Sequence, residues 1–444
     1  MADGLNDGYA RLSTMKRMTP TRRDVLRWGG LATSALVVGC GDNELVRDPG
    51  SQLASAVLET ESDSFSVAVW GQLARAVALE VHHGDSLLFS DHAALDDHTW
   101  TFGVGGLPAG ETFRVRVAAD TGAELWHQVR TAPAPTDTRA VRIAVGADVD
   151  PNPEFDSELV EHLLAAGPEL FVSIGDFPYT DNGPPAMTLD EYRARHVEAR
   201  TSLRVRRLLG SVGVRAIYDD HEFRNNWDAM YRAAESERYD AAMQAWNEFF
   251  PVPLTVDSNK NYSVGNYRSW RWGANVECFL LDTREYRSAN GAVDDANKTM
   301  LGATQLAWLI DGVRTSRAPF KIIFTSVPLD FGDGVDHWAG FTTERTAMFD
   351  ALAGVPGVLF VSGDQHWFAA HRHDRGIREL QIGPLARGIG MPMRTAPGVL
   401  FRSEQYNVGL IDIDDASLTF SGLGADGTVF YKETLSVEDL TPAS

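Results

Sequence analysis

The sequence predicts a small all-β domain followed by a larger α/β domain. Two runs of alternating apolar and polar residues, at 64–70 and 112–117, have the period of two that is typical of half-buried strands. The pattern then changes, because an apolar strand, a stretch with helical spacing and a second apolar strand follow one another between residues 141 and 174. This β-α-β unit indicates a mixed sheet flanked by helices, and it places the domain boundary near Asp137.

The composition is that of a globular protein with a large core. The chain has 444 residues, of which 44% are apolar and 23% are charged. Its net charge of −21 would repel a phosphate backbone, so no nucleic-acid binding is expected, whereas an acidic surface suits divalent cations. The only cysteines are Cys40 and Cys278, which excludes a disulfide framework, and the apolar run at 276–281 indicates that Cys278 is a buried thiol.

The first forty residues have the features of an export signal. The adjacent Arg22 and Arg23 precede an apolar stretch at 28–38 that is too short and too rich in glycine to span a bilayer comfortably. This arrangement resembles a twin-arginine signal, which implies the twin-arginine export machinery as a partner and a periplasmic or cell-surface location. The stretch ends at Cys40 in a sequence that resembles a lipobox, so Cys40 is either a lipid attachment site or a chance cysteine in a cleaved peptide.

The all-β segment resembles a fibronectin type III or Ig-like sandwich. Residues 107–117, in which Pro108 and Gly110 turn the chain into a strand, are similar to the penultimate hairpin of that fold. A Pro-rich stretch at 131–136 is typical of a short, stiff linker. The expected organisation is a signal at 1–40, a linker at 41–54, a sandwich at 55–134, an α/β domain at 137–435 and a tail at 436–444.

Further elements of the α/β domain follow from apolar periodicity. The pattern predicts helices at 189–208, 235–249 and 303–315 and strands at 214–218, 276–281, 321–325 and 358–361. Alternating runs at 409–413 and 428–431 predict antiparallel strands near the C-terminus.

Acidic residues follow four of the predicted strands, at 146–150, 175–179, 218–222 and 362–366. One acid after a strand is usually a turn or helix-cap residue. Four such groups indicate a site, because ligands gather at the carboxyl ends of strands in open α/β sheets. Carboxylates brought together repel one another unless a cation neutralises them, so their convergence predicts metal binding.

The motifs resemble those of the PhoD-like alkaline phosphatases, a branch of the calcineurin-like metallophosphoesterases that is related to the purple acid phosphatases. The matching set is a strand followed by Asp148, Gly-Asp-x-x-Tyr at 175–179, Asp-Asp-His-Glu at 219–222, Leu-Asp-Thr-Arg-x-Tyr-Arg at 281–287 and Gly-Asp-x-His at 363–366. The resemblance runs from about residue 55 to the C-terminus. It implies an αββα-type catalytic domain behind the N-terminal sandwich and two or more bound metal ions.

Three residues of the first two motifs acquire metal-binding roles from this resemblance. Asp176 resembles the carboxylate that bridges both metals, and Tyr179 resembles the phenolate that binds Fe(III). A core or lid tyrosine is the alternative for Tyr179. Asp148 stands where this family commonly has a cysteine, so its role as a ligand rests on the aspartate found there in the wider superfamily.

By the same resemblance, the remaining motifs provide the ligands of the second metal and the proton donor. Asp220 and Asp364 are assigned to the second site, which has only oxygen ligands and therefore favours Ca or Mn over Zn, and His366 is assigned to the first. His221 resembles the histidine that assists the leaving group, with a structural histidine as the alternative. Arg284 either clamps the phosphate or pairs with carboxylates.

The implied function is an exported metal-dependent phosphoesterase of the alkaline phosphatase D type. A water shared by two metals would attack a phosphate monoester or diester, of a small molecule or a phospholipid head group. The alternative is a surface-tethered binding protein that keeps its metals only for structure. The sequence does not distinguish these substrates, and it does not predict the oligomeric state.

Overall fold

The structure, a computed structural model, describes residues 53–95, 98–150, 152, 157–252, 266–330, 334–390 and 398–444. The predicted export signal at 1–40, including Cys40, lies outside the described residues, as does most of the linker at 41–54. Within the described part of the chain, no helix has the length and apolar character needed to cross a bilayer.

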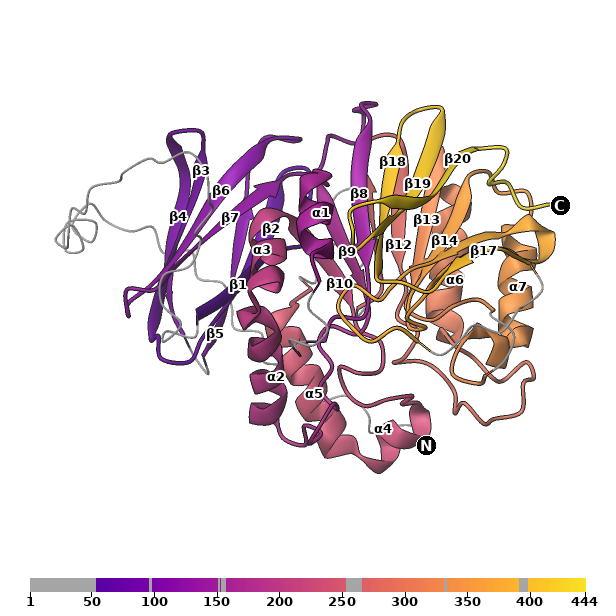
Figure 1. The fold of residues 1–444 in the computed structure, drawn as a ribbon, viewed down its shortest axis with the longest axis horizontal. Coiled ribbons are helices and arrows are strands. Elements are labelled where there is room, and N and C mark those ends of the chain that lie inside the picture. Colours follow the sequence, from indigo (N-terminus) through magenta and orange to yellow (C-terminus); the bar gives the residue numbers. More distant parts are fainter. Residues whose placement is uncertain are drawn as a thin grey trace, which may run out of the picture. The chain divides into compact units, whose positions relative to one another are not determined.

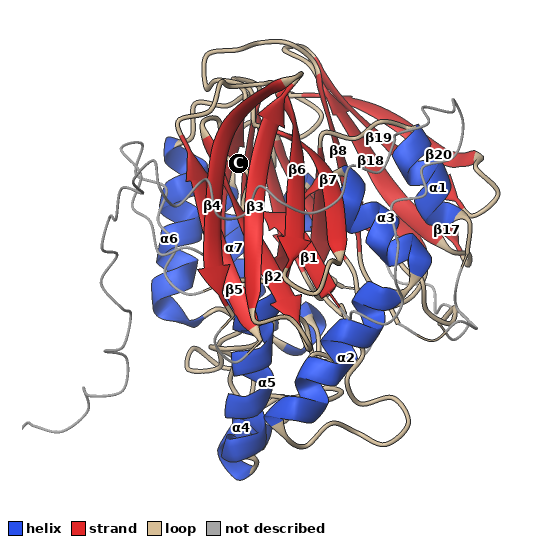
Figure 2. Ribbon diagram, turned by 90° about the vertical axis from the view of Figure 1, so that its left-hand side faces the viewer, coloured by secondary structure: helices blue, strands red, loops and turns tan. Residues whose placement is uncertain are grey.

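The described chain begins with seven strands in two layers (Figure 2). One layer is the antiparallel group β1 (Leu53–Leu58), β2 (Ser64–Gly71) and β5 (Thr99–Gly105). The other has the order β4-β3-β6-β7, with β3 (Ala76–His83), β4 (Ser86–Ala94), β6 (Thr112–Ala119) and β7 (Glu124–Arg130). Apolar side chains from both layers, such as Val67 and Val115, form one buried cluster, so the two layers share a core.

The first layer is continuous with the central sheet, because β1 pairs in parallel with β10. The sheet has nine strands in the order β20-β19-β18-β8-β9-β10-β1-β2-β5. Its further strands are β8 (Val141–Gly146), β9 (Leu170–Ile174), β10 (Gly213–Ile217), β18 (Asn407–Ile413), β19 (Ser417–Gly424) and β20 (Val429–Ser436). The last three strands are antiparallel to their neighbours, as the alternating pattern of the C-terminal region predicts.

A second large sheet packs against the first (Figure 1). It has seven strands in the order β11-β12-β13-β14-β16-β15-β17. These are β11 (Arg268–Trp272), β12 (Val276–Leu280), β13 (Phe320–Thr325), β14 (Val358–Ser362), β15 (Phe368–Arg372), β16 (Arg378–Gln381) and β17 (Val399–Ser403). Cys278 on β12 is a free, buried thiol, as predicted.

Helices cover the outer faces of both sheets, which completes the expected αββα order of layers (Figures 1 and 2). The helices are α1 (Leu159–Ala165), α2 (Leu189–Thr201), α3 (Leu203–Ser211), α4 (Ala229–Ala234), α5 (Ser236–Phe249), α6 (Gly302–Thr315) and α7 (Thr342–Leu352). Strand β8 shows how the layers arise from sequence: Ile143 and Val145 face the other sheet, and Ala144 between them faces the helices.

The single helix predicted at 189–208 is wrong, because the structure breaks it into α2 and α3. Ser202 at the break has an extended ψ of 132°. Apolar spacing continues on both sides of this residue, so the periodicity gives no sign of the break. The residues at 436–444 pack onto the fold, since Leu440 is buried and its carbonyl accepts a hydrogen bond of 2.7 Å from the Val358 amide.

His127 connects the first seven strands to the helical layer. Its Nδ1 lies 3.0 Å from the Leu209 carbonyl in α3, and its Nε2 lies 2.6 Å from the Ser55 hydroxyl in β1. Burial lowers the pKa of His127 from 6.5 to about 4, although the Leu209 carbonyl opposes the shift. The folded protein therefore holds this imidazole in its neutral form.

This burial predicts a loss of stability in mild acid. Between about pH 6.5 and pH 4 the unfolded chain binds a proton at His127 that the folded chain does not, so the free energy of unfolding falls as the pH drops. The full contribution is about 3 kcal/mol. Denaturant unfolding at pH 7 and pH 4.5 should show that acidification lowers the free energy of unfolding less, or raises it more, in His127→Gln than in the wild type. The exposed-site control His92→Gln should match the wild type, and equal pH dependence in all three proteins would refute the prediction.

Candidate metal centre

The acidic residues that follow β8, β9, β10 and β14 meet at one edge of the packed sheets. The carboxyl ends of these strands carry all of the predicted ligands, which are Asp148, Asp176, Tyr179, Asp220, Asp364 and His366. Their carboxylates and the imidazole of His366 fall into overlapping groups whose ligand atoms lie within 4.8 Å of one another. Asp176 belongs to every group at this edge, which is the arrangement required of a bridging carboxylate.

Strained backbone aims these side chains at a common point. Asp148, Asp176, Asp364 and His366 have φ values of 62°, 57°, 74° and 59°, in the left-handed region that non-glycine residues rarely adopt. The described residues contain eight such non-glycine positions, so half of them are predicted metal ligands. Strain of this kind costs of order 1–3 kcal/mol per residue and gathers at functional sites.

The first group combines oxygen and nitrogen donors. The Tyr179 hydroxyl donates to Asp176 Oδ2 at 2.9 Å and lies 2.7 Å from His366 Nε2. His366 Nε2 is 3.9 Å from Asp148 Oδ1, while its Nδ1 lies 2.7 Å from the Gly388 carbonyl. The contact with Gly388 fixes the ring so that Nε2 points toward the three oxygen donors.

The second group consists of carboxylates. Oxygen atoms of Asp176, Asp219, Asp220 and Asp364 lie within 4.8 Å of one another. Asp219 is already satisfied, because it accepts bonds from the Ser326 hydroxyl at 2.6 Å and from Arg284. The other three carboxylates form an all-oxygen donor set, as expected for a hard cation.

The burial and the mutual repulsion of the carboxylates in the cluster favour binding of a cation. Burial and the repulsion of neighbouring carboxylates raise the pKa values of Asp148, Asp176, Asp220 and Asp364. Among the described residues, neither Asp148 oxygen has a hydrogen-bond partner, and Asp220 Oδ1 has none either. Buried, unpartnered carboxylate oxygens cost free energy that coordination to a metal removes. The donor set is therefore suited to metal ions.

Burial, followed by the charge of Asp176, raises the pKa of the Tyr179 phenol well above its usual range. The protein alone therefore keeps Tyr179 protonated. A bound cation would oppose this shift and favour the phenolate form.

His221 belongs to the cluster, since one of its ring nitrogens lies within 4.8 Å of carboxylate oxygens of Asp176 and Asp220. It is oriented by a residue that the sequence did not single out. Its Nδ1 is 2.7 Å from Asp181 Oδ1, and Asp181 Oδ2 also accepts the Asn225 amide at 2.7 Å. Burial opposes protonation of His221, but the charges of Asp220 and Asp181 prevail and raise its pKa to about 9. Because Nδ1 of the ring is bonded to Asp181, Nε2 is the nitrogen that remains for a second contact.

Arg284 is fully buried in an ion-pair network. Its Nε and Nη2 donate to Asp219 at 2.7 and 2.9 Å, and its Nη1 and Nη2 each donate to Asp336 at 2.8 Å. These contacts occupy the guanidinium on both sides and match the structural pairing that the sequence leaves open for this residue. They differ from those of a phosphate clamp, so they favour the structural interpretation of Arg284 over the catalytic one.

We therefore expect Arg284→Met to lower stability. The substitution leaves the buried Asp219 without its ion-pair partner and Asp336 with Arg287 alone, which should cost about 3–5 kcal/mol of unfolding free energy. Chemical denaturation provides the measurement. The control Arg207→Met removes a partly exposed ion pair with Glu161 and should cost no more than about 1 kcal/mol. If Arg284→Met leaves stability unchanged and raises KM, Arg284 would instead bind the phosphate of the substrate.

Two more polar groups around the site were not predicted. Asp336 accepts bonds from Arg284, Arg287 and Asn290, and it lies in a loop without strand or helix periodicity. The Arg387 guanidinium stacks 4.6 Å above the Tyr179 ring and donates to Asp150 at 3.1 Å. Arg387 belongs to the glycine-rich segment at 382–390, and the contact between Gly388 and His366 places this segment at the site.

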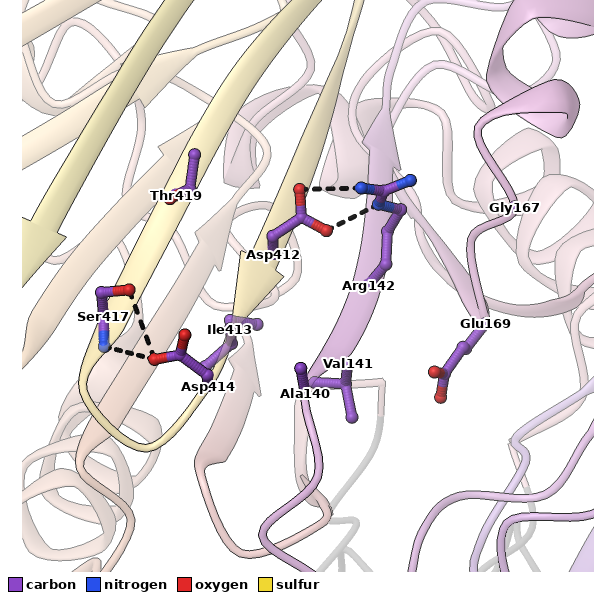
Figure 3. Close-up of a pocket in the computed structure, with 10 residues that line it drawn as sticks. All are labelled: Ala140, Val141, Arg142, Gly167, Glu169, Asp412, Ile413, Asp414, Ser417 and Thr419. Atoms are coloured by element: carbon purple, nitrogen blue, oxygen red, sulfur yellow. Dashed lines mark hydrogen bonds and ion pairs between the residues drawn. The ribbon is translucent and has the colours of Figure 1, made fainter.

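A pocket at the opposite end of the central sheet is a different feature (Figure 3). It lies beside the first residues of β8 and the last residues of β18. Arg142 there is paired with Asp412, and Asp414 accepts hydrogen bonds from Ser417. Arg142 and Asp412 pair with each other, Glu169 pairs with Arg139, and none of the lining residues is a predicted ligand, so this pocket is not the candidate centre.

Comparisons with solved structures support the fold. A structure of PhoD has a TM-score of 0.75 and 17% sequence identity, and the match covers 88% of this chain and 90% of that one. The purple acid phosphatase PPD1 from seeds of yellow lupin (Lupinus luteus) has a TM-score of 0.62 and 11% identity, over 88% of this chain and 76% of that one. The chain therefore shares the fold of both phosphatases.

Sequence comparisons identify the family. Alkaline phosphatase D of Bacillus subtilis (strain 168) is 25% identical over 235 residues, which are 47% of this chain and 40% of that protein. The chain thus spans less than half the length of this curated relative. A family model for PhoD-like phosphatases matches residues 157–392, more than half of the chain. On the strength of this match, the chain belongs to the PhoD-like phosphatase family.

Proposed function

We propose that the chain is an exported, metal-dependent phosphoesterase that hydrolyses phosphate monoesters, diesters or both. The observation that carries this proposal is the cluster of buried, partly unpartnered carboxylates with His366 and Tyr179 at one sheet edge. Membership of the PhoD-like phosphatase family supports the reaction class.

The donor atoms suggest how two ions would be held. Asp148, Asp176, Tyr179 and His366 would hold one ion, for which Fe(III) suits the phenolate. Asp176, Asp220 and Asp364 would hold a second, for which Ca, Mn or Zn is proposed. When bound, such cations supply the Lewis acidity that makes water nucleophilic near neutral pH and offsets charge on the phosphoryl oxygens.

The protein's own groups would position the reactants and move one proton. His221 would donate a proton from Nε2 to the departing alkoxide, because Asp181 holds Nδ1. Arg284 acts as a positioning residue: it holds Asp219 in place and lies 3.7 Å from Asp220, which belongs to the second donor set.

We further propose a location, a domain architecture and a class of substrate for this protein. Export through the twin-arginine machinery, with a lipid on Cys40, would place the protein in the periplasm or on the cell surface. The first seven strands would be a fibronectin type III or Ig-like sandwich attached to the catalytic domain. Small-molecule phosphates and phospholipid head groups share the phosphoryl chemistry that this centre recognises.

Replacing the shared carboxylate tests the function. Asp176→Asn should reduce hydrolysis of 4-nitrophenyl phosphate and of its diester at least about 10³-fold and should deplete bound metal, because Asp176 belongs to both donor sets. Activity assays with elemental analysis of each protein provide the measurement. The control Asp190→Asn alters an acid whose side chain is 92% exposed and should change neither property.

Two other outcomes would count against the proposal. Full activity in Asp176→Asn would exclude Asp176 as a ligand shared by the two metal ions. A wild-type protein that contains metal but turns over no ester would favour the alternative of a surface-tethered binding protein with structural metals.

Asp181→Asn tests the proton donor separately from the metals. A weaker partner at Nδ1 should misorient His221 and lower kcat for an alkyl phosphate by about 10²-fold. The loss should be much smaller for 4-nitrophenyl phosphate, whose leaving group needs little protonation, and metal content should stay unchanged. Equal losses for the two substrates would argue that Asp181 only supports the loop.

A further inference from the structure

A second cluster of metal-ligating side chains lies away from the candidate centre. His371 on β15 pairs across the antiparallel ladder with Glu379 on β16, and His373 follows directly after β15 ends. One ligand atom from each of the three residues lies within 4.8 Å of the others. The cluster sits on the side of the sheet covered by α7, where the His373 ring contacts the Phe349 ring at a centroid distance of 6.2 Å.

The carboxylate of this cluster is buried and ionised. Glu379 is fully buried, and its Oε1 accepts bonds from the Leu329 amide at 2.9 Å and the Ser362 hydroxyl at 2.6 Å. Its Oε2 lies 2.6 Å from His373 Nε2. Although burial opposes ionisation, the contact with His373 prevails and lowers the pKa of Glu379 to about 2. Glu379 therefore presents a negative charge to the two imidazoles.

The hydrogen-bonding capacity of the buried His371 ring is not satisfied by the described residues. The residue is 1% exposed, and neither of its ring nitrogens has a hydrogen-bond partner among the described residues. The Oε1 of the neighbouring Gln381 is also unpartnered, and this side chain is close enough to the His371 ring to oppose the lowering of its pKa by burial. The ring stacks on His373 with centroids 5.3 Å apart and planes inclined by 13°, so both imidazoles face the same carboxylate. A buried imidazole without partners is costly, and a cation coordinated by its nitrogen removes that cost.

We propose that His371, His373 and Glu379 form a binding site for a divalent cation of the zinc type, separate from the phosphoesterase centre. Two neutral imidazoles and one carboxylate are a donor set that suits Zn²⁺, and three protein ligands leave a fourth position for water. Burial lowers the pKa of His371, which keeps that ring in the neutral form that binds metals. The cation would replace the proton shared by His373 and Glu379 and would give His371 its missing partner.

The position of this site indicates a structural role. Its ligands come from β15, from β16 and from the residue next to β15, and Ser362 at the end of β14 is hydrogen-bonded to Glu379. Ser362 is followed by the loop that carries Asp364 and His366. A cation at this site would therefore brace three strands beneath that loop without contacting the substrate.

Zinc stoichiometry tests the proposal on the full chain. Metal-free protein is loaded with Zn²⁺, freed of excess metal and analysed for zinc per chain by mass spectrometry. His371→Gln and His373→Gln should each bind one equivalent less than the wild type and the control His92→Gln. Their hydrolysis of 4-nitrophenyl phosphate, measured after loading with the metals that activate the wild type, should stay within about twofold. Unchanged zinc content in both variants would overturn the proposal, and if His371→Gln does not fold, the His373→Gln variant decides the result.

A thermal measurement separates this site from the candidate catalytic centre. In an Asp176→Asn background, added Zn²⁺ should still raise the unfolding temperature, and the additional change His373→Gln should abolish that rise. An equal rise with and without His373 would show that the ions bind elsewhere. Because the background removes the shared ligand of the phosphoesterase centre, failure of the proposed function and failure of this site give different results.

Discussion

The structure is organised around the electrostatic cost of placing several carboxylates in one buried volume. Asp148, Asp176, Asp220 and Asp364 approach one another where little water can screen them, and each has a raised pKa as a result. Arg284 is a buried cation 3.7 Å from Asp220, and it is shared between Asp219 and Asp336. Arg284 and His221 together do not offset the charge of four ionised acids, so the donor set is suited to cations from outside the chain.

This constraint explains features that lie outside the carboxylates themselves. Two packed sheets bring the carboxyl ends of β8, β9, β10 and β14 to one edge, but ordinary extended or helical backbone would point the following side chains in different directions. The left-handed conformations of Asp148, Asp176, Asp364 and His366 turn them inward. The large apolar core shared by the sheets supplies the rigidity that maintains this strain.

Much of this arrangement could be predicted from sequence, because it is local. Strands such as β8 and β9 appear as apolar runs, and the acid after each strand is adjacent in the chain. What could not be predicted depends on contacts between distant residues. Arg284 meets Asp219 and Asp336 across 65 and 52 residues, and Asp181 meets His221 across 40. Single arginines and aspartates in loops carry no periodicity that reveals such pairs.

Pairing across long distances also limits domain prediction. The change of pattern near Asp137 is real, since strands give way to alternating strands and helices there. Yet β1 pairs with β10 more than 150 residues later, so the first strands extend the central sheet. Apolar alternation reveals that a segment forms strands, but it carries no information about which sheet those strands join.

The His371 cluster and the candidate centre are linked by a continuous set of hydrogen bonds. Glu379 accepts the Ser362 hydroxyl, the amide of the next residue, Gly363, donates to the Ser326 carbonyl at 3.1 Å, and the Ser326 hydroxyl donates to Asp219 at 2.6 Å. Asp219 in turn holds Arg284. Every step joins buried groups, so a displacement at Glu379 would leave polar atoms unpaired along the path. The same requirement, that buried polar atoms find partners, therefore governs both clusters and ties the start of the Asp364 loop to Glu379 and to Ser326.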